Sequence, residues 1–244
     1  MTPAPPSSRS PERTLKAERE RIQRVYEEYN ASDYHRQIWG EGPVSRLILD
    51  HKWERIGSIL RSSRLSLGAA RILDIGAGEG RDAARFRDLG AEARRILAFD
   101  LRQFSLRAGR NDQPWLSAVC GDACQLPFRS DSFDIAYQST MISSILIPSV
   151  RRRILEEIGR VVAPGGFFLS YDTRYPNPAN RNTMPLRLTE LTEAFKGWSV
   201  RTWSITAIPQ LQRLVGRISL GGCRALERIP ILRSHLLVLI GKPA

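Results

Sequence analysis

A glycine-rich turn between a short apolar run and a helical segment constrains the fold more than any other feature of the sequence. Residues 72–75 are apolar apart from Asp74, and residues 76–80 then read Gly-Ala-Gly-Glu-Gly before a helical pattern begins at Arg81. Glycines in such a turn let the backbone approach a ligand closely, because no side chain intervenes, and the amide groups of the following helix face that ligand. The segment therefore predicts a strand, a ligand-binding turn and a helix.

Short apolar runs alternate with helical stretches from residue 71 onward. The apolar runs predict strands at residues 71–75, 95–100, 116–120, 133–138, 166–171, 199–206 and 235–241. The helical patterns between them lie at residues 81–88, 103–107, 149–160 and 188–195. Strands that alternate with helices are typical of βαβ units, which form a parallel sheet.

The sequence before this region has a different character. Residues 1–18 are rich in proline, serine and charge, which is typical of a disordered tail. Residues 19–68 form a predicted helical cap, in which the spacing of Ile22, Tyr26 and Tyr29 places three side chains on one helix face. Residues 69–244 form the predicted sheet domain, with a basic helical insertion at about residues 209–230.

Composition excludes several classes of protein. Hydrophobic residues make up 42% of the chain and charged residues 25%, which is the balance of a folded globular protein. No run approaches the ~18 apolar residues that a membrane span needs. The three cysteines are too few for a disulfide framework, so a cytoplasmic location is expected. Cysteines and histidines also lack the spacing of zinc ligands, so no metal site is expected.

Acidic residues follow two of the predicted strands where they could hold a nucleoside. Asp100 ends the second strand, 20 residues after Gly80, where a carboxylate accepts hydrogen bonds from both ribose hydroxyls. Asp122 follows the third strand and could accept a hydrogen bond from an adenine amino group. A dinucleotide fingerprint requires glycine where Arg81 stands, so the pattern disfavours a nicotinamide or flavin dinucleotide.

These motifs, with the Pro-Gly-Gly turn at residues 164–166, resemble those of the class I S-adenosylmethionine-dependent methyltransferases. The similarity is greatest to the small-molecule branch around the quinone-biosynthesis C-methyltransferases, and it covers residues 70–175 strongly. The resemblance implies an α/β fold, a Rossmann-like doubly wound seven-stranded sheet whose last strand is antiparallel. It also implies S-adenosyl-L-methionine as the cofactor and S-adenosyl-L-homocysteine as the product.

The resemblance further implies a role for individual residues. The turn at residues 76–80 would cradle the methionine part of the cofactor, Asp100 would hold the ribose, and Asp122 with Ala123 would contact the adenine. Gln138, after the fourth strand, would line the methyl-transfer site. The expected cofactor-binding residues are Asp74, Gly76, Ala77, Gly78, Gly80, Asp100, Leu101, Asp122, Ala123 and Gln138.

Candidates for acceptor binding and catalysis come from the cap and from the segment after the fifth predicted strand. Ligands bind at the carboxyl edge of open α/β sheets, where residues 171–180 are expected. The expected acceptor contacts are Tyr34, Trp39, Ser139, Arg174 and Asn177. Asp172 and His35 are the candidates for a general base that removes the proton of a hydroxyl acceptor. Methyl transfer otherwise depends on holding donor and acceptor at reacting distance.

Several functions fit these residues. The preferred hypothesis is O-methylation of a sugar or secondary metabolite. The alternatives are a quinone-type C-methyltransferase, an RNA methyltransferase and a noncatalytic cofactor-binding module. Enzymes that methylate nucleobase amino groups carry an Asn/Asp-Pro-Pro-aromatic motif after the fourth strand, whereas residues 138–141 here read Gln-Ser-Thr-Met. This difference argues against a nucleic-acid partner.

Positive charge is concentrated near the C-terminal end. The net charge is +12, and residues 181–244 hold 10 basic and 3 acidic side chains. The expected apolar face of the insertion comprises Leu211, Leu214, Val215 and Ile218. The arginines beside it are Arg213, Arg217, Arg224 and Arg228. The insertion is expected to cover the acceptor pocket together with the cap. There it would guide an anionic acceptor, lie on an inner membrane surface, or form a solvated face.

Overall fold

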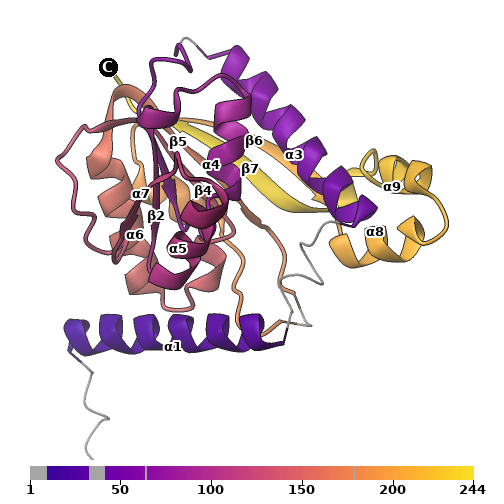
Figure 1. Cartoon of the computed structure of the whole chain (residues 1–244), viewed down its shortest axis with the longest axis horizontal. Helices are drawn as coiled ribbons and strands as arrows, with labels where there is room; N and C mark the ends of the chain where they lie inside the picture. The colour runs from indigo at the N-terminus through magenta and orange to yellow at the C-terminus, as the bar shows by residue number, and fades with distance from the viewer. Residues whose placement is uncertain (1–9, 33–41, 64, 178–179) are drawn as a thin grey trace, which may run out of the picture.

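A seven-stranded sheet forms the centre of the computed structural model, which describes residues 10–32, 42–63, 65–177 and 180–244 (Figure 1). The strands are β1 (Ile72–Ile75), β2 (Ile96–Asp100), β3 (Ser117–Cys120), β4 (Phe133–Ser139), β5 (Val162–Thr173), β6 (Ser199–Ala207) and β7 (Arg233–Gly241). Their order is β3-β2-β1-β4-β5-β7-β6, and only β7 runs antiparallel to its neighbours. The predicted doubly wound sheet with an antiparallel last strand is confirmed.

The strand order reverses at β1. This strand lies between β2 and β4, and its last residue, Ile75, pairs with Phe99 on one side and Gln138 on the other. The segments that leave β1 and β4 diverge at such a reversal and leave a crevice beyond the carboxyl ends of the strands. The fold therefore places a ligand site at the end of β1.

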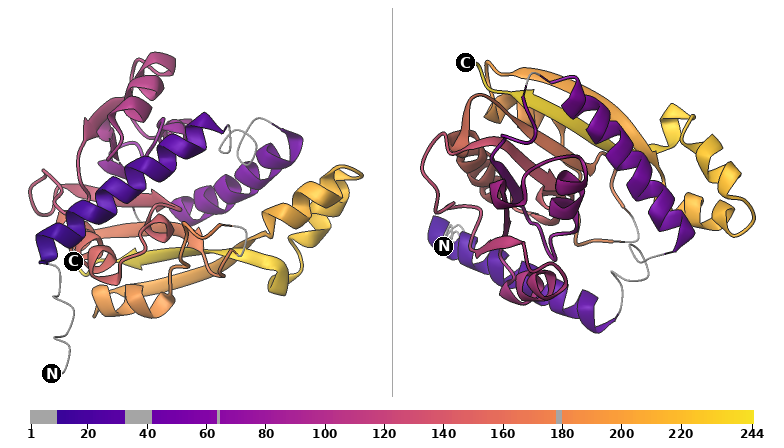
Figure 2. Two further views of the ribbon diagram at one scale, coloured as in Figure 1. Left: turned by 90° about the horizontal axis from the view of Figure 1, so that it is seen from below. Right: turned by 45° about the horizontal axis from the view of Figure 1, so that its top comes forward.

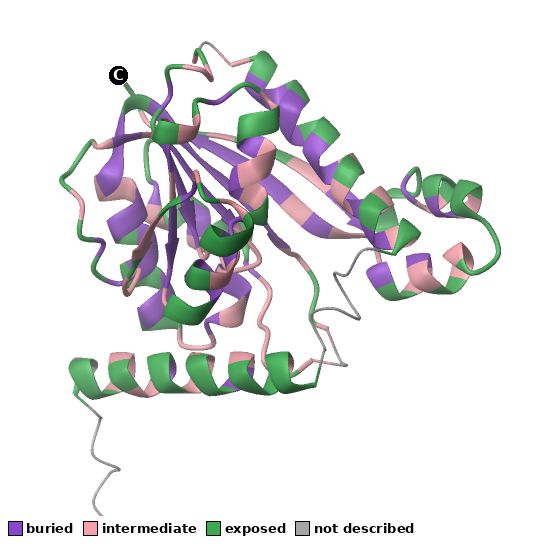
Figure 3. Ribbon diagram, viewed as in Figure 1, coloured by how far each residue is buried: buried purple, intermediate pink, exposed green. Residues whose placement is uncertain are grey.

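Helices cover both faces of the sheet (Figure 2). One face carries α3 (Pro43–Arg61), α4 (Arg81–Asp88) and α5 (Gln103–Asp112), and the other carries α6 (Pro148–Val161) and α7 (Leu188–Ala194). Consecutive residues of a strand point to opposite faces, so Phe167 enters one core and Phe168 the other. Figure 3 shows buried strands between helices whose outer residues are exposed. Three short 3-10 helices complete the set, η1 (Ala93–Arg95), η2 (Ile142–Ser144) and η3 (Pro230–Leu232).

The first helix begins earlier than the sequence predicts. Helix α1 spans Pro11–Ala31, so residues 11–18 are helical and not part of a tail. The Ser10 side chain caps the N-terminus by accepting a hydrogen bond from the backbone N–H of Arg13, at 3.4 Å. Proline fits at position 11 because a residue in the first turn of a helix donates no intrahelical hydrogen bond, so the missing N–H of Pro11 costs nothing. The helix crosses the carboxyl edge of the sheet, below the strands in Figure 1.

Two helices, α8 (Pro209–Gly216) and α9 (Leu220–Leu226), connect β6 to the segment before β7. We call residues 209–232 the α8–α9 insertion; it packs beside α3 and projects from the body in Figure 1. The predicted apolar face is wrong, because Leu214 and Ile218 are exposed while Gln212 is buried. The Gln212 amide donates hydrogen bonds to the Ala207 carbonyl, at 3.0 Å, and to Glu227, at 2.7 Å, which turns the polar side of α8 inward.

Candidate active site

A pocket opens at the carboxyl ends of β1, β2 and β4, at the reversal of strand order. Its empty volume is about 720 Å³ with the open mouth included. Six of the predicted residues contribute to its lining, namely Gly76, Asp100, Leu101, Asp122, Ala123 and Ser139. The structure thus brings residues from three strands to one site.

The glycine turn has the backbone that the sequence predicts. Gly76, Gly78 and Gly80 all have positive φ angles, of 76°, 57° and 71°. A β-carbon on Gly76 would lie 2.5 Å from the side chain of Met141, and one on Gly80 would lie 2.4 Å from the side chain of Leu116. Glycine is required here both for backbone conformation and for space.

Asp100 uses its whole carboxylate within the protein. One oxygen accepts hydrogen bonds from the backbone N–H and Nε of Arg102, at 2.8 and 2.9 Å, and the other accepts from Arg102 Nη2 and the N–H of Gly78, at 3.0 and 2.7 Å. Two carboxylate oxygens offer about four lone-pair sites in total. A ribose that binds Asp100 must therefore displace the guanidinium of Arg102, which also lies 4.0 Å from the ring centroid of Tyr26.

Asp122 and Cys124 form the opposite end of the pocket, after β3. Asp122 Oδ1 accepts a hydrogen bond from the N–H of Cys124, at 2.9 Å, and Oδ2 lies 3.9 Å from a guanidinium nitrogen of Arg19. Burial, reinforced by the charge of Asp122, raises the pKa of the Cys124 thiol to about 12. Cys124 is accordingly a neutral wall residue at physiological pH and not a nucleophile.

Helix α1 forms one wall of the pocket through Leu15, Glu18, Arg19, Ile22 and Tyr26. Glu18 is buried and accepts a hydrogen bond from the N–H of Leu146, at 2.6 Å. Burial alone would raise the pKa of Glu18, but hydrogen bonds from Arg21 and Leu146 lower it overall. These contacts fasten α1 across the carboxyl edge of the sheet. Figure 2 shows the course of this helix past the strands.

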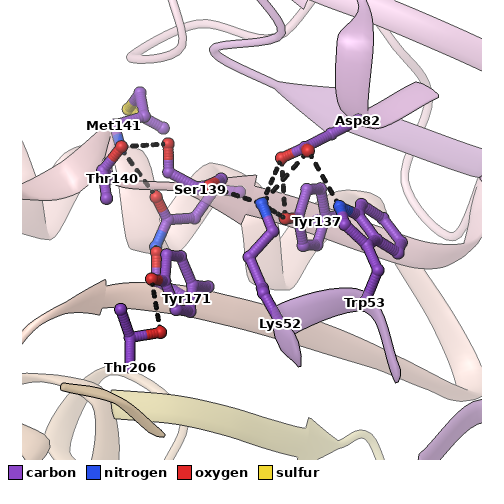
Figure 4. Close-up of polar contacts among 10 residues, drawn as sticks. Lys52, Trp53, Asp82, Tyr137, Ser139, Thr140, Met141, Tyr171 and Thr206 are labelled. Atoms are coloured by element: carbon purple, nitrogen blue, oxygen red, sulfur yellow. Dashed lines mark hydrogen bonds and ion pairs between the residues drawn. The ribbon is translucent and has the colours of Figure 1, made fainter. Parts of the chain in front are cut away.

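A buried lysine from α3 lies behind the pocket (Figure 4). Lys52 Nζ donates hydrogen bonds to both carboxylate oxygens of Asp82, at 3.1 and 2.9 Å, to Tyr137 Oη at 3.1 Å, and to Ser139 Oγ at 3.2 Å. Trp53 Nε1 and Tyr137 Oη also donate to Asp82, at 3.2 and 2.8 Å. Burial alone would raise the pKa of Asp82. The charge and hydrogen bonds of Lys52, together with the hydrogen bonds of Tyr137 and Trp53, outweigh burial and lower the pKa overall, which favours the charged carboxylate. The cluster ties α3 and α4 to the end of β4.

Sequence reasoning missed Lys52, although α3 carried a signal for it. Ile48, Lys52 and Ile56 are spaced four apart and share one helix face, and all three are buried. A lysine within an apolar stripe indicates a buried ion pair, because an unpaired buried ammonium is costly. The acidic partner, Asp82, is 30 residues away and could not be assigned from the pattern.

Asp74, directly before the glycine turn, has an unsatisfied oxygen. The residue is 2% exposed, and its Oδ2 has no hydrogen-bond partner among the described residues. Burial, and next the charge of Asp82, raise the pKa of Asp74 well above its usual range. A buried carboxyl group with a free oxygen can accept a hydrogen bond from a bound ligand.

Several predicted site residues lie outside the pocket lining, namely Asp74, Ala77, Gly78, Gly80, Gln138 and Asp172. The side chains of Gln138 and Asp172 are engaged elsewhere. Gln138 is fully buried; its amide nitrogen donates to Ser170 Oγ at 2.6 Å, and its oxygen accepts from the N–H of Met141 at 2.9 Å. Asp172 is 1% exposed and accepts hydrogen bonds from the N–H groups of Ser143 and Thr173, at 3.1 and 2.8 Å. Burial raises the pKa of Asp172. Both side chains hold the loop after β4 and do not face the pocket.

The remaining predictions divide between described and undescribed residues. Ser139 lines the pocket, whereas Arg174 lies over the ring of Tyr175, 4.7 Å from its centroid, and neither Arg174 nor Asn177 is part of the lining. Tyr34, His35 and Trp39 lie outside the described residues. The α8–α9 insertion contributes nothing to the lining, so the expectation that it covers the pocket is wrong.

Within the part of the chain that the structure describes, no cluster of histidine, cysteine, aspartate or glutamate side chains is arranged to bind a metal ion. None of the helices in the described ranges combines the length and the hydropathy needed to traverse a bilayer.

Comparison with known proteins relates the site to a family. Residues 73–170 match the family described as "Methyltransferase domain". A demethylmenaquinone methyltransferase of Paenarthrobacter aurescens is 30% identical over 125 residues, which are 51% of this chain and 46% of the relative. A phthiotriol/phenolphthiotriol dimycocerosates methyltransferase of Mycobacterium tuberculosis is 33% identical over 118 residues, 48% of this chain and 42% of the relative. The chain thus matches less than half the length of these relatives.

Solved structures show the same fold. An S-adenosylmethionine-dependent methyltransferase from Mesorhizobium loti has a TM-score of 0.55 at 18% identity, with 76% of this chain and 96% of the other covered. The [4+2]-cyclase SpnF has a TM-score of 0.54 at 17% identity, with coverages of 78% and 82%. Since a cyclase shares the architecture, the fold alone does not establish methyl transfer.

The pocket fits S-adenosylmethionine. Gly76 leaves room for the methionine part, and Asp100 and Asp122 line the pocket as acceptors for a nucleoside. Asp74, which precedes the turn and is not part of the lining, has a carboxyl oxygen without a partner among the described residues. The adjustment needed is the departure of Arg102 from Asp100. The family match covers the lining residues from Ile75 to Ile154 but not those of α1, and we conclude that residues 73–170 form a methyltransferase domain of the S-adenosylmethionine-dependent type.

Proposed function

We propose that the protein methylates a small, largely apolar acceptor of the quinone or lipid type. The observation that carries this proposal is the apolar wall of the pocket opposite the glycine turn. The wall comes from α1, from the segment after β4 and from α6, and it comprises Leu15, Ile22, Ile145, Val150 and Ile154. Aliphatic side chains favour an apolar acceptor over a sugar, which needs polar partners for its hydroxyls. The names of the relatives, quinone and lipid methyltransferases, agree with this class.

The residues of the pocket act by positioning. Bound S-adenosylmethionine supplies an electrophilic methyl group on a sulfonium. Asp100 and Asp122 orient the nucleoside end, and Gly76 allows the backbone to approach the methionine end. Helix α1 excludes water from the wall where the acceptor would lie. Holding two reactants in line at contact distance lowers the barrier without a further catalytic group.

The methylated atom in this proposal is a carbon of an electron-rich ring. A sugar hydroxyl needs a base to remove its proton. Among the described lining residues, the carboxylates of Glu18, Asp100 and Asp122 are occupied by hydrogen bonds or ion pairs, and Asp172 is not at the pocket. A quinol ring attacks the methyl group through a ring carbon. The S–CH3 bond breaks to leave S-adenosylhomocysteine, and the ring C–H proton that the methyl group replaces passes to water. Because this proton leaves after the attack, the reaction needs no base positioned to activate the nucleophile, whereas a sugar hydroxyl does.

An assay with deuterated S-adenosylmethionine tests the proposal. Purified protein is incubated with a short-chain demethylmenaquinol, a long-chain phenolic lipid, a sugar panel and a short RNA, and products are identified by mass. We expect label in the quinol or the lipid, attached to carbon, and none with Gly76→Ala, because its β-carbon would clash with Met141 and strain the turn that lines the pocket. Label in the sugars or the RNA would contradict the acceptor class. Thermal stabilisation by NAD but not by S-adenosylmethionine would contradict the cofactor.

A further inference from the structure

Large apolar side chains are exposed mainly on the α8–α9 insertion. Of the eight large hydrophobic residues that are exposed in the described chain, five lie between residues 214 and 231. They are Leu214, Ile218, Leu220, Ile229 and Ile231, with exposed fractions of 61%, 91%, 43%, 43% and 77%. The other three are scattered over separate elements. A concentration of this kind marks an interaction surface, since single exposed hydrophobics need no explanation but clusters do.

The polar side of the insertion faces the protein. Gln212 is fully buried and Glu227 is 9% exposed, and the two share a hydrogen bond of 2.7 Å. His51 of α3 lies 3.4 Å from the same glutamate, and this carboxylate raises the pKa of His51. A helix pair on a water-exposed surface normally buries its apolar side chains and exposes its polar ones. The insertion departs from this pattern in part, because it buries Gln212 and Glu227 while Leu214, Ile218 and Ile231 stay exposed.

Arginines accompany the exposed aliphatic residues. Arg217, Arg224 and Arg228 are exposed, and none of them forms an ion pair with a described residue. Arg217 adjoins Ile218, and Arg228 adjoins Ile229. The only acidic residue between 209 and 232 is the buried Glu227. Much of the insertion is coloured as exposed in Figure 3. Its outer surface therefore combines aliphatic side chains with three arginines that have no ion-pair partner among the described residues.

We propose that this surface docks on a membrane with anionic headgroups. Aliphatic side chains would enter the interface between headgroups and acyl chains while the arginines bind phosphates, as in amphipathic membrane-surface segments. Residues 209–232 contain no aromatic residue and no methionine. Protein–protein interfaces are rich in aromatic residues and methionine, and proteins bind single-stranded nucleic acid by stacking bases on aromatic rings. A protein partner and a nucleic acid therefore fit this surface less well than a membrane does.

Vesicle sedimentation tests the docking without donor or acceptor, so its result is independent of the proposed reaction. The vesicles are phosphatidylcholine alone or an equal mixture with phosphatidylglycerol. The whole protein is expected to sediment with the mixed vesicles at low salt and to bind the neutral ones much less. At about 1 M salt, where the screening length is about 3 Å, binding should weaken severalfold but persist through the apolar contacts.

Two variants separate the components of the surface. Arg217→Gln/Arg224→Gln/Arg228→Gln should weaken vesicle binding ~100-fold at low salt. This fold-change assumes that each arginine loses one contact with a lipid phosphate. Ile218→Ser/Ile231→Ser should weaken it about tenfold or more at both salt concentrations. The first control is Arg107→Gln/Arg110→Gln/Arg129→Gln, which removes the same charge from exposed positions elsewhere. The second is Phe104→Ser/Leu188→Ser, which removes exposed apolar side chains elsewhere.

Four outcomes would overturn the proposal. The first is wild-type protein that stays in the supernatant with the mixed vesicles. The second is a loss of binding that is equal in the control variants. The third is displacement of the protein from vesicles by a short RNA whose binding is lost in the arginine variant but kept in the isoleucine variant. The fourth is a wild-type dimer in sedimentation equilibrium that becomes monomeric with Ile218→Ser/Ile231→Ser, which would identify a second copy of the chain as the occupant.

Discussion

Replacing Arg102 by methionine should increase the affinity for S-adenosylmethionine. The guanidinium donates two hydrogen bonds to Asp100, at 2.9 and 3.0 Å, and stacks on Tyr26 at 4.0 Å. Burial would lower the pKa of Arg102, but Asp100 raises it, so the cation is firmly held. In the wild-type protein, the ribose hydroxyls must displace this cation before they reach the carboxylate. Methionine keeps an apolar stem of similar length and leaves the carboxylate free.

The expected gain in cofactor affinity follows from the hydrogen bonds between Arg102 and Asp100 that the ribose no longer has to displace. A hydrogen bond between charged groups contributes about 1.5–3 kcal/mol, and the released guanidinium regains part of that from water. A net difference of about 1.5–3 kcal/mol corresponds to roughly 10- to 100-fold tighter cofactor binding. Without cofactor, the variant should be less stable by a similar amount, because Asp100 keeps only the backbone N–H groups of Gly78 and residue 102 as donors.

Titration calorimetry with S-adenosylmethionine and S-adenosylhomocysteine measures the affinity, and urea unfolding measures the stability. The matched control is Arg71→Met, because Arg71 also binds a carboxylate with two nitrogens, at 3.1 and 2.8 Å to Asp134, but lies away from the pocket. This control should leave cofactor affinity unchanged. A folded Arg102→Met protein that binds the cofactor equally well or more weakly than wild type would refute the displacement argument.

Three further predictions concern the buried groups and the turn. Lys52→Met should lower the free energy of unfolding by about 3–5 kcal/mol in urea titration, since Asp82 is left charged and buried, and the double variant Lys52→Met/Asp82→Asn should recover much of it. Gly76→Ala should abolish cofactor binding in calorimetry, whereas Gly90→Ala, also at positive φ but with nothing within 4 Å of a β-carbon, should not. His235 has a pKa lowered to about 3 by burial and then by the charge of Lys52, so it stays neutral in the folded protein. In the unfolded chain, the imidazole of His235 binds a proton once the pH falls below its ordinary pKa of 6.5. The free energy of unfolding should therefore fall by up to about 1.4 kcal/mol per pH unit between pH 6.5 and pH 3 because of this residue.

Each of these has a clear contrary result. A Lys52→Met protein as stable as wild type would show that the ion pair contributes nothing net. Equal cofactor binding by the Gly76 and Gly90 variants would remove the glycine turn from the site. The pH effect is isolated with His235→Phe, which keeps a ring in the stack on Tyr171, 4.8 Å between centroids. If its stability falls between pH 6.5 and pH 5 as steeply as that of wild type, His235 is not responsible.

Local patterns in the sequence predicted the sheet well. Residues 81–88 were expected to be helical, and α4 spans those residues; six predicted strands differ from the observed ones by one or two residues at one end. These elements are visible because apolar runs, glycines and helix periodicity are local signals. β5 starts four residues earlier than expected because Val162 pairs with Phe133 before an irregularity in register, and such pairing is not local.

The site was harder to predict because it depends on which way side chains point. Gln138 and Ser139 are neighbours at the end of β4, yet Ser139 faces the pocket and Gln138 faces the interior. A strand alternates its faces, so an uncertainty of one residue in register exchanges the two roles. The burial of Gln212 depends likewise on Glu227, 15 residues further along the chain. Contacts of this kind come from tertiary packing and not from composition.

The position of α1 has a consequence for ligand exchange. The helix forms one wall of the pocket and is fastened there by Glu18, which accepts from the N–H of Leu146, and by Tyr26, which bonds to Ser144. In the proposed reaction, we expect exchange of donor and product to require local opening of these contacts. Variants that loosen them should therefore change the rate of ligand exchange more than the equilibrium affinity.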